Sequence, residues 1–214
     1  MAELASACRH IGICVRDDAQ VESLLHGENG IFAHAAKGTL IAIHSTVTQA
    51  GLLGWAREAA QLGLHLIDAP ITGGADRAAA GTLCYMVGGS EEQLAASSPV
   101  FATSAEKIVH AGGIGAGIAL KLCNNFMQYA EFVVMAEAVR LAESCGLKPE
   151  VMREVGLSNG VVNEQMYKFV TGRNAYLVPS NDPGIIQYFT AMGELACKDL
   201  DCAIGTAAEK GVVM

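Results

Sequence analysis

The sequence has little charge, no Cys-x-x-Cys pair and no long uninterrupted apolar run. Only 17% of its 214 residues are charged, with 14 basic and 22 acidic side chains and no basic stripe, so a nucleic-acid-binding surface is not expected. A membrane helix needs about 18 or more consecutive apolar residues, and here charges or glycines interrupt every such stretch. The opening MAELASACRHIGICV has no basic segment ahead of an apolar one and does not resemble a secretory signal.

The seven cysteines and the 51% hydrophobic content indicate what kind of protein interior to expect. An odd number of cysteines without Cys-x-x-Cys spacing favours reduced, buried thiols in a cytoplasmic protein over disulfides or a metal site. Abundant apolar residues and sparse charge exclude bulk disorder. A chain of this length can bury a sizeable core without cross-links.

The first half of the chain alternates between short β-rich runs and amphipathic stretches. Asp17 or Asp18 is placed to cap a helix directly after the first run. This alternation predicts an α/β fold with a mostly parallel, doubly wound sheet. The expected strands are 11–15, 39–44, 64–67, 84–87 and 107–110, and the other expected helices are 52–62 and 91–97.

After Gly117 the strand signals stop. Residues 118–145 contain no proline or glycine and predict one long helix, which Gly146 ends. Further helices are expected near 150–157, 161–171 and 185–210. The sequence therefore predicts an α/β domain at 1–113 and an all-helical domain at 114–214, joined by the long helix.

Lys121 is the first candidate for chemistry, because it is the sole charged residue from Ile108 to Tyr129 apart from a histidine. Asn125 lies four residues later, on the same helix face. A lysine can exchange protons near neutral pH if burial brings its pKa from about 10.4 to about 7–8. The alternative is a lysine that extends its amine to solvent or forms an ion pair between domains.

Three other segments carry polar groups at positions suited to binding. Thr72, Gly73 and Gly74 follow a strand end, where free N–H groups and a hydroxyl could hold a carboxylate or form a plain turn. His44-Ser45-Thr46 also follows a strand, and capping of the next helix is the favoured interpretation there. Lys198 lies one turn after Glu194, a spacing typical of a solvated helix face.

Together these segments resemble the β-hydroxyacid dehydrogenase family, in its 3-hydroxyisobutyrate dehydrogenase-like branch. The resemblance rests on DAPITGGADRAAAGTL at 68–83, GIGAGIALKLCNN at 113–125 and KDLDCA at 198–203. HSTVT at 44–48 and ICVRDD at 13–18 fall in the family's order. Asn124-Asn125, where 6-phosphogluconate dehydrogenase carries a His-Asn pair, favours a short acid over a sugar phosphate.

The resemblance implies a Rossmann-type domain, reversible hydride transfer between NAD or NADP and a short β-hydroxyacid, and a role for each matching residue. Lys121 would be the general acid/base and Asn125 would orient it. The carboxylate would lie at Thr72, Gly73 and Gly74, with threonine in place of the usual serine. The residues implied at the cofactor are Val15, Arg16, Gln20, Thr46 and Lys198. Arg16 and Gln49 stand where the family commonly has proline, and at Gln49 little effect is expected.

The sequence departs from the family at both ends. The Gly-x-Gly-x-x-Gly turn that would hold a dinucleotide's diphosphate does not occur, and the family's closing helix is also lacking. We therefore expect an internal piece of the enzyme that binds NAD(P) poorly by itself. The alternative is a non-catalytic binding or scaffold protein. The expected partners are a small carboxylate substrate and a second copy in a homodimer or homotetramer, with no nucleic acid or membrane.

Overall fold

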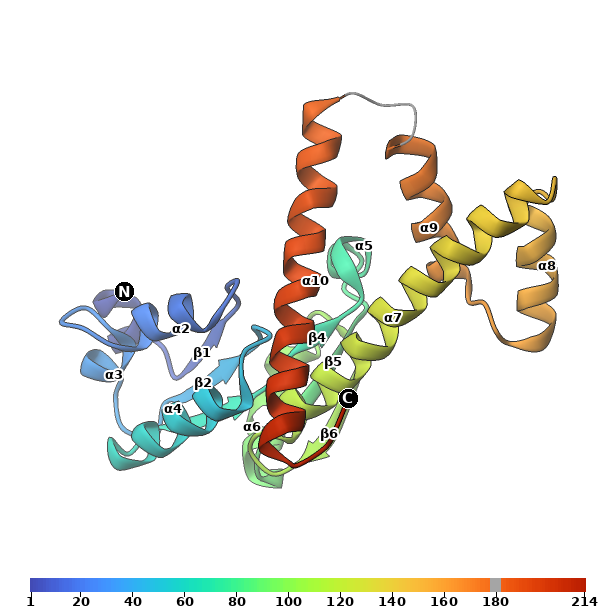
Figure 1. Ribbon diagram of the computed structural model, residues 1–214. Coiled ribbons are helices and arrows are strands. Elements are labelled where there is room, and N and C mark those ends of the chain that lie inside the picture. The colour runs from blue at the N-terminus through green and yellow to red at the C-terminus, as the bar shows by residue number, and fades with distance from the viewer. Residues whose placement is uncertain (178–181) are drawn as a thin grey trace. The chain divides into compact units, whose positions relative to one another are not determined.

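The computed structural model describes residues 1–177 and 182–214, which form two compact units (Figure 1). The first unit contains Met1–Cys123 and Asp199–Met214, and the second contains Asn124–Lys198. Each unit is described by itself below.

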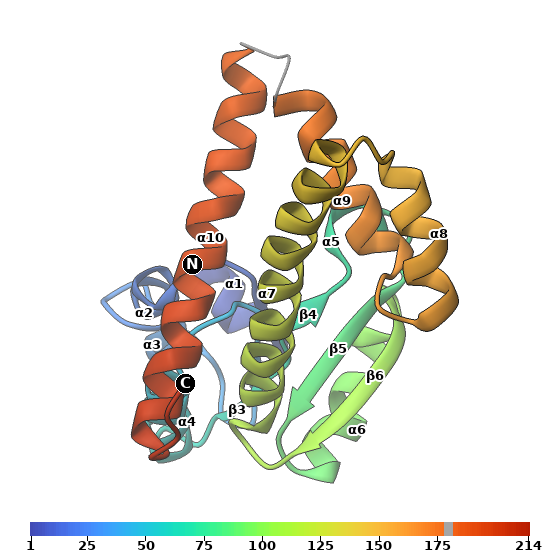
Figure 2. The same ribbon diagram turned by 45° about the vertical axis from the view of Figure 1, so that its right-hand side comes forward.

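The first unit is built on a six-stranded sheet in the order β1-β2-β3-β5-β4, with β6 beside β5. Strands β1, β2 and β3 are parallel to one another, as are β5 and β6, which run side by side in Figure 2. Strand β5 is antiparallel to β3 and β4. The strands are β1 His10–Ile13, β2 Leu40–Ile43, β3 His65–Asp68, β4 Ile71–Thr72, β5 Leu83–Gly88 and β6 Ala105–Gly112. The predicted α/β architecture with a mainly parallel sheet is confirmed.

Two of the helices in this unit begin at side-chain caps that the sequence indicates. Asp17 accepts a hydrogen bond from the Gln20 amide at the start of α2. Ser90 and Gln93 form a capping box at the start of α6. The short helices α1, α3 and α5 were not predicted. The helices are α1 Ala2–Ala7, α2 Asp18–Leu25, α3 Ile31–His34, α4 Gln49–Gln61, α5 Gly74–Ala79 and α6 Glu91–Phe101.

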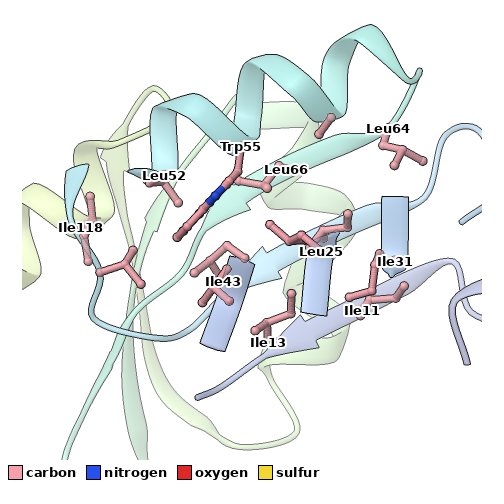
Figure 3. Packing of buried hydrophobic residues seen from close by; sticks show 14 of the residues in the cluster. Ile11, Ile13, Leu25, Ile31, Ile43, Leu52, Trp55, Leu64, Leu66 and Ile118 are labelled. Carbon is pink, nitrogen blue, oxygen red and sulfur yellow. The ribbon is translucent and has the colours of Figure 1, made fainter. Parts of the chain in front are cut away.

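Both faces of the sheet are buried, because successive side chains of a strand point to opposite sides. In β2, Ile41 and Ile43 belong to one hydrophobic cluster and Leu40 and Ala42 to another. Figure 3 shows the first cluster, in which α4 covers the sheet and Trp55 and Leu52 point towards the strands. On the opposite face Phe101 of α6 packs in the second cluster.

Four long helices complete the chain: α7 Ala116–Ser144, α8 Pro149–Asn159, α9 Glu164–Leu177 and α10 Pro183–Glu209. Helices α7 and α10 each contribute residues to both units. Ile118, Leu122 and Ala203 pack in the core of the first unit, so the contact-based division falls inside these two helices. The second unit has its own cluster, made of Met135, Val139, Val162, Met166 and Val170.

Two sequence expectations concern the surface. All seven cysteines are free, but the prediction that they are buried was wrong. Four of them are exposed and three are half-buried, and of the half-buried ones Cys8 and Cys202 pack at the margin of the first cluster. The exposed ones are Cys14, Cys123, Cys145 and Cys197. Within the described residues, no helix combines the length and the hydropathy that crossing a membrane requires.

Candidate active site

The parallel strands β1, β2 and β3 bring three predicted segments to one edge of the sheet. Their registers align Ile13 with Ile43 and Ile43 with Asp68, so the chain leaves all three strands at the same level. Ligands of open α/β sheets bind beyond this carboxyl edge. The segments that begin at Val15, Thr46 and Ala69 therefore share it.

The segment after β1 is fastened to the segment after β2. The Val15 amide donates to the Ser45 hydroxyl over 2.7 Å, and the Arg16 amide donates to Oε1 of Gln20 over 2.9 Å. Thr46 is half-buried, whereas Arg16 and Gln20 are exposed. The predicted cofactor residues of the first unit thus lie along one edge, apart from Lys198, which belongs to the second unit.

The expectation that Ser45 or Thr46 caps the next helix was wrong. Thr48 caps α4, because its hydroxyl accepts the Gly51 amide. Asp18 in turn accepts the Thr48 amide at 3.1 Å. The Ser45 hydroxyl is used by Val15 instead, which leaves the strand ends tied together by side chains.

His44 connects the ends of β2 and β3. Its Nδ1 donates to the Ala69 carbonyl over 2.8 Å, and its ring meets those of Tyr85 and Phe101 edge-on. Burial lowers the pKa of His44, although the hydrogen bond to Ala69 opposes that change. His44 therefore has a structural role beneath the edge.

The predicted substrate loop contains a two-residue strand and leads into helix α5. Ile71 and Thr72 form β4 and pair with Tyr85 and Cys84 of β5. Gly73 and Gly74 follow with φ values of +136° and +71°, a region of backbone conformation that glycine adopts without strain. Thr72 and Gly73 are half-buried and Gly74 is exposed. Both glycines are thus explained by backbone conformation, whether or not a ligand binds.

Lys121 and Asn125 lie one turn apart in α7, with exposed fractions of 9% and 3%. The division between the two compact units falls between them, within one unbroken helix. Asn124 donates a hydrogen bond to Oδ1 of Asn125. A buried amine next to a buried carboxamide is an arrangement that can hold and transfer a proton.

Asp68 is a residue that sequence reasoning did not single out. It ends β3, is 1% exposed, and its carboxylate accepts the backbone amides of Gly115 at 2.8 Å and Ile118 at 2.6 Å. Burial raises the pKa of Asp68, and the hydrogen bonds from Gly115, Ile118 and Gly117 oppose the rise. Asp68 therefore anchors the start of α7 beside the substrate loop. The sequence shows an aspartate shortly before Gly73-Gly74, but it does not indicate that this carboxylate binds the amides of Gly115 and Ile118.

The helix N-termini at the carboxyl edge show whether a dinucleotide's diphosphate could bind there. The N-termini of α2 and α4 are capped by Asp17 and Thr48, and Asp18 adds a carboxylate at the second. A diphosphate is best held by free N–H groups at a helix N-terminus. These two capped helix N-termini are therefore poorly suited to hold a diphosphate.

Comparison with known proteins matches both halves of the chain to related families. Residues 1–113 match the family described as the NAD binding domain of 6-phosphogluconate dehydrogenase. Residues 115–214 match the family described as NAD-binding of NADP-dependent 3-hydroxyisobutyrate dehydrogenase.

Curated relatives and solved structures agree with these matches. An uncharacterized oxidoreductase of Mycobacterium tuberculosis is 36% identical over 200 residues, which are 91% of this chain and 65% of that protein. A 3-hydroxyisobutyrate dehydrogenase of Pseudomonas aeruginosa is 41% identical over 63% of this chain and 45% of its own length. The chain thus spans less than two thirds of these relatives.

Among solved structures, 3-hydroxyisobutyrate dehydrogenase of Mycobacterium tuberculosis with L-serine superposes with a TM-score of 0.79 at 29% identity. The match covers 100% of this chain and 72% of that structure. The chain belongs to the β-hydroxyacid dehydrogenase family of NAD-binding oxidoreductases.

Proposed function

We propose that the protein transfers hydride between NAD or NADP and a short-chain β-hydroxyacid of the 3-hydroxyisobutyrate or serine type, with Lys121 as general acid/base. The observation that carries this proposal is a lysine and a carboxamide, both buried, one turn apart in α7. Family membership supports the oxidoreductase class. L-Serine in the related structure supports a small, polar acid as substrate.

A bound nicotinamide would supply the hydride acceptor. The chain's own residues would bind and orient the substrate and transfer its hydroxyl proton. In this proposal Nζ of Lys121 takes the hydroxyl proton during oxidation and returns it during reduction. Asn125 orients the amine and the substrate oxygen. Thr72, Gly73 and Gly74 hold the carboxylate through a hydroxyl and backbone N–H groups. Val15, Arg16, Gln20 and Thr46 would line the nicotinamide end, and the family resemblance assigns Lys198 to the cofactor as well.

Replacement of Lys121 by alanine tests the assigned chemistry. We expect kcat to fall by about 10²–10⁴-fold, the usual contribution of a general acid/base, while NAD(P)H binding is retained. Turnover is measured as dinucleotide reduction with 3-hydroxyisobutyrate and with L-serine, at high dinucleotide concentration. Lys107→Ala, which removes an exposed lysine of β6, is the matched control. Near-wild-type turnover in Lys121→Ala would remove Lys121 from the mechanism.

Thr72 offers a separate test of the carboxylate site. Thr72→Val keeps the shape of the side chain but removes its hydroxyl, so KM for the hydroxyacid should rise by about tenfold or more, as for a lost hydrogen bond to a charged group. Thr72→Ser keeps the hydroxyl and should keep KM near the wild-type value. Equal KM values in both variants would place the carboxylate elsewhere. Binding of the acid without turnover in the wild type would favour the non-catalytic alternative.

A further inference from the structure

The backbone of Gly115 is held by side chains at both its N–H and its carbonyl group. Its N–H donates to Oδ1 of Asp68 over 2.8 Å, and its carbonyl accepts from Nε2 of Gln49 over 3.0 Å. Gly115 is buried and has φ +88°, a conformation that favours glycine, and α7 begins at the next residue. Two elements distant in sequence, the end of β3 and the start of α4, thus determine where α7 begins.

Asp68 also holds the first turn of the helix. Its second oxygen accepts the Ile118 amide at 2.6 Å, so the carboxylate bridges amides on both sides of the helix start. The first N–H groups of a helix have no partner within it and carry partial positive charge, which a carboxylate complements. Burial of a carboxylate costs free energy unless hydrogen bonds compensate it. The joint formed by Asp68 and the amides of Gly115 and Ile118 therefore strongly disfavours any other placement of the helix start.

Close backbone packing at Gly117 adds to this restriction. A Cβ atom at Gly117 would lie 2.3 Å from the Met86 carbonyl oxygen and 2.8 Å from the Gly88 nitrogen. The first turn of α7 therefore rests directly on the backbone of β5. Lys121 follows Gly117 by four residues and lies on the same helix face.

Gln49 gains a role from this arrangement that the sequence did not indicate. It is the first residue of α4 and is half-buried, and its side chain reaches Gly115 across 66 positions of sequence. Proline is well tolerated at the first position of a helix, and the preceding Thr48 has ψ 143°, which a following proline favours. The amide side chain can therefore be removed without disturbing α4.

We propose that Asp68 and Gln49 are positioning residues that fix Lys121 relative to the loop at Thr72–Gly74, because Asp68 holds the N–H group of Gly115 and Gln49 holds its carbonyl group. Asp68 lies four residues before Thr72, so a side chain close to the loop in sequence holds the start of the helix that carries Lys121. The inference rests on the function proposed above, in which Lys121 and the loop act on the same substrate.

The test compares Gln49→Pro and Asp68→Asn with two matched controls in the full chain. Gln49→Pro removes the donor to the Gly115 carbonyl. Asp68→Asn preserves shape but places an NH₂ group against one of the two backbone amides. The controls are Gln61→Ala, at the exposed end of α4, and Asp76→Asn, on the exposed surface of α5. Trp55 fluorescence and circular dichroism establish that each variant is folded.

The first readout is the rate at which Lys121 reacts with an acylating reagent, measured by mass spectrometry across pH with exposed Lys107 as internal reference. We expect a severalfold change in this rate for Gln49→Pro and Asp68→Asn, and none for the controls. Faster amide hydrogen exchange at Gly115–Ile118 should accompany it. The second readout is kcat, expected to fall by about 10- to 100-fold while KM changes less, as for a displaced catalytic group.

Unchanged Lys121 reactivity in folded Gln49→Pro and Asp68→Asn would overturn the proposal, even if their stability falls. If Asp68→Asn does not fold, Gln49→Pro decides the question alone. The acylation of Lys121 can be measured without turnover. An inactive wild type would therefore contradict the proposed function, and the reactivity of Lys121 would still decide the positioning proposal.

Discussion

The two compact units differ in how much apolar surface they bury. The first has a sheet covered on both faces and two hydrophobic clusters, whereas the second has one cluster of five buried residues. Helices are stabilised mainly by packing, so the second unit should open at a lower free energy. Its helices also carry exposed apolar side chains, among them Val133, Val134, Leu141, Val151 and Val155. The geometry proposed for the reaction therefore depends chiefly on the more strongly packed unit, in which the loop, Asp68 and Lys121 all lie.

The largest expected effect comes from the core of the first unit. Ile43→Ala removes a fully buried side chain from β2 and should lower the free energy of unfolding by about 2–5 kcal/mol. Trp55 is the sole tryptophan and packs in the same cluster, so its fluorescence in a urea titration reports this unit alone. Ile186→Ala, at an exposed site of α10, is the matched control and should leave the Trp55 transition unchanged.

A smaller effect is expected in the second unit. Val139→Ala removes two buried methyl groups from the five-residue cluster and should cost about 2 kcal/mol. The loss should appear in the helical circular dichroism at low urea and leave the Trp55 transition in place. Val134→Ala, exposed on the same helix, should change neither signal. If the urea midpoints of the Trp55 signal and the helical signal shift by the same amount, the two units unfold together. That result would contradict the lower free energy of opening expected for the second unit.

The smallest effect is a pH dependence localised at Asp68. Its pKa is raised by burial in the folded protein, so the folded state binds the proton more tightly than the unfolded state does. This contribution to stability is fully present below the ordinary aspartate pKa and is lost as pH rises through the folded value. The free-energy difference between wild type and Asp68→Asn, from urea titrations at several pH values, should therefore shift against the wild type as pH increases. A difference that is constant with pH would show that Asp68 titrates normally.

The sequence predicted the fold well where a single element carries its own signal. Runs such as 39–44 and 64–67 became β2 and β3, and the glycine-free stretch 118–145 became α7. The antiparallel pairing of β5 was missed, because β4 consists of Ile71 and Thr72 alone and two residues have no periodicity. The short helices α1 and α3 lack caps made by side chains, which removes the usual sequence signal.

The candidate site was predictable in its residue types and less so in its contacts. Lys121 stood out because little else nearby is charged, and its predicted place in a long helix is confirmed. Its assigned role stays a prediction, as do those of Asn125 and the loop. The link from Asp68 to Gly115 spans 47 residues, and nothing local to either residue indicates it. Likewise Thr48 and Ser45 look equivalent in sequence, and the fold alone decides which hydroxyl caps α4.

The joint beneath Lys121 also limits how this chain can evolve. A Cβ atom at Gly88 would lie 2.3 Å from Oδ1 of Asp68, and one at Gly117 would lie 2.9 Å from Oδ2. Neither glycine can acquire a side chain while the aspartate remains in place, and loss of the aspartate leaves the amides at the start of α7 without their partner. A substitution at any one of the three positions therefore creates a clash or removes a hydrogen-bond partner at the start of α7 unless the neighbouring backbone moves as well.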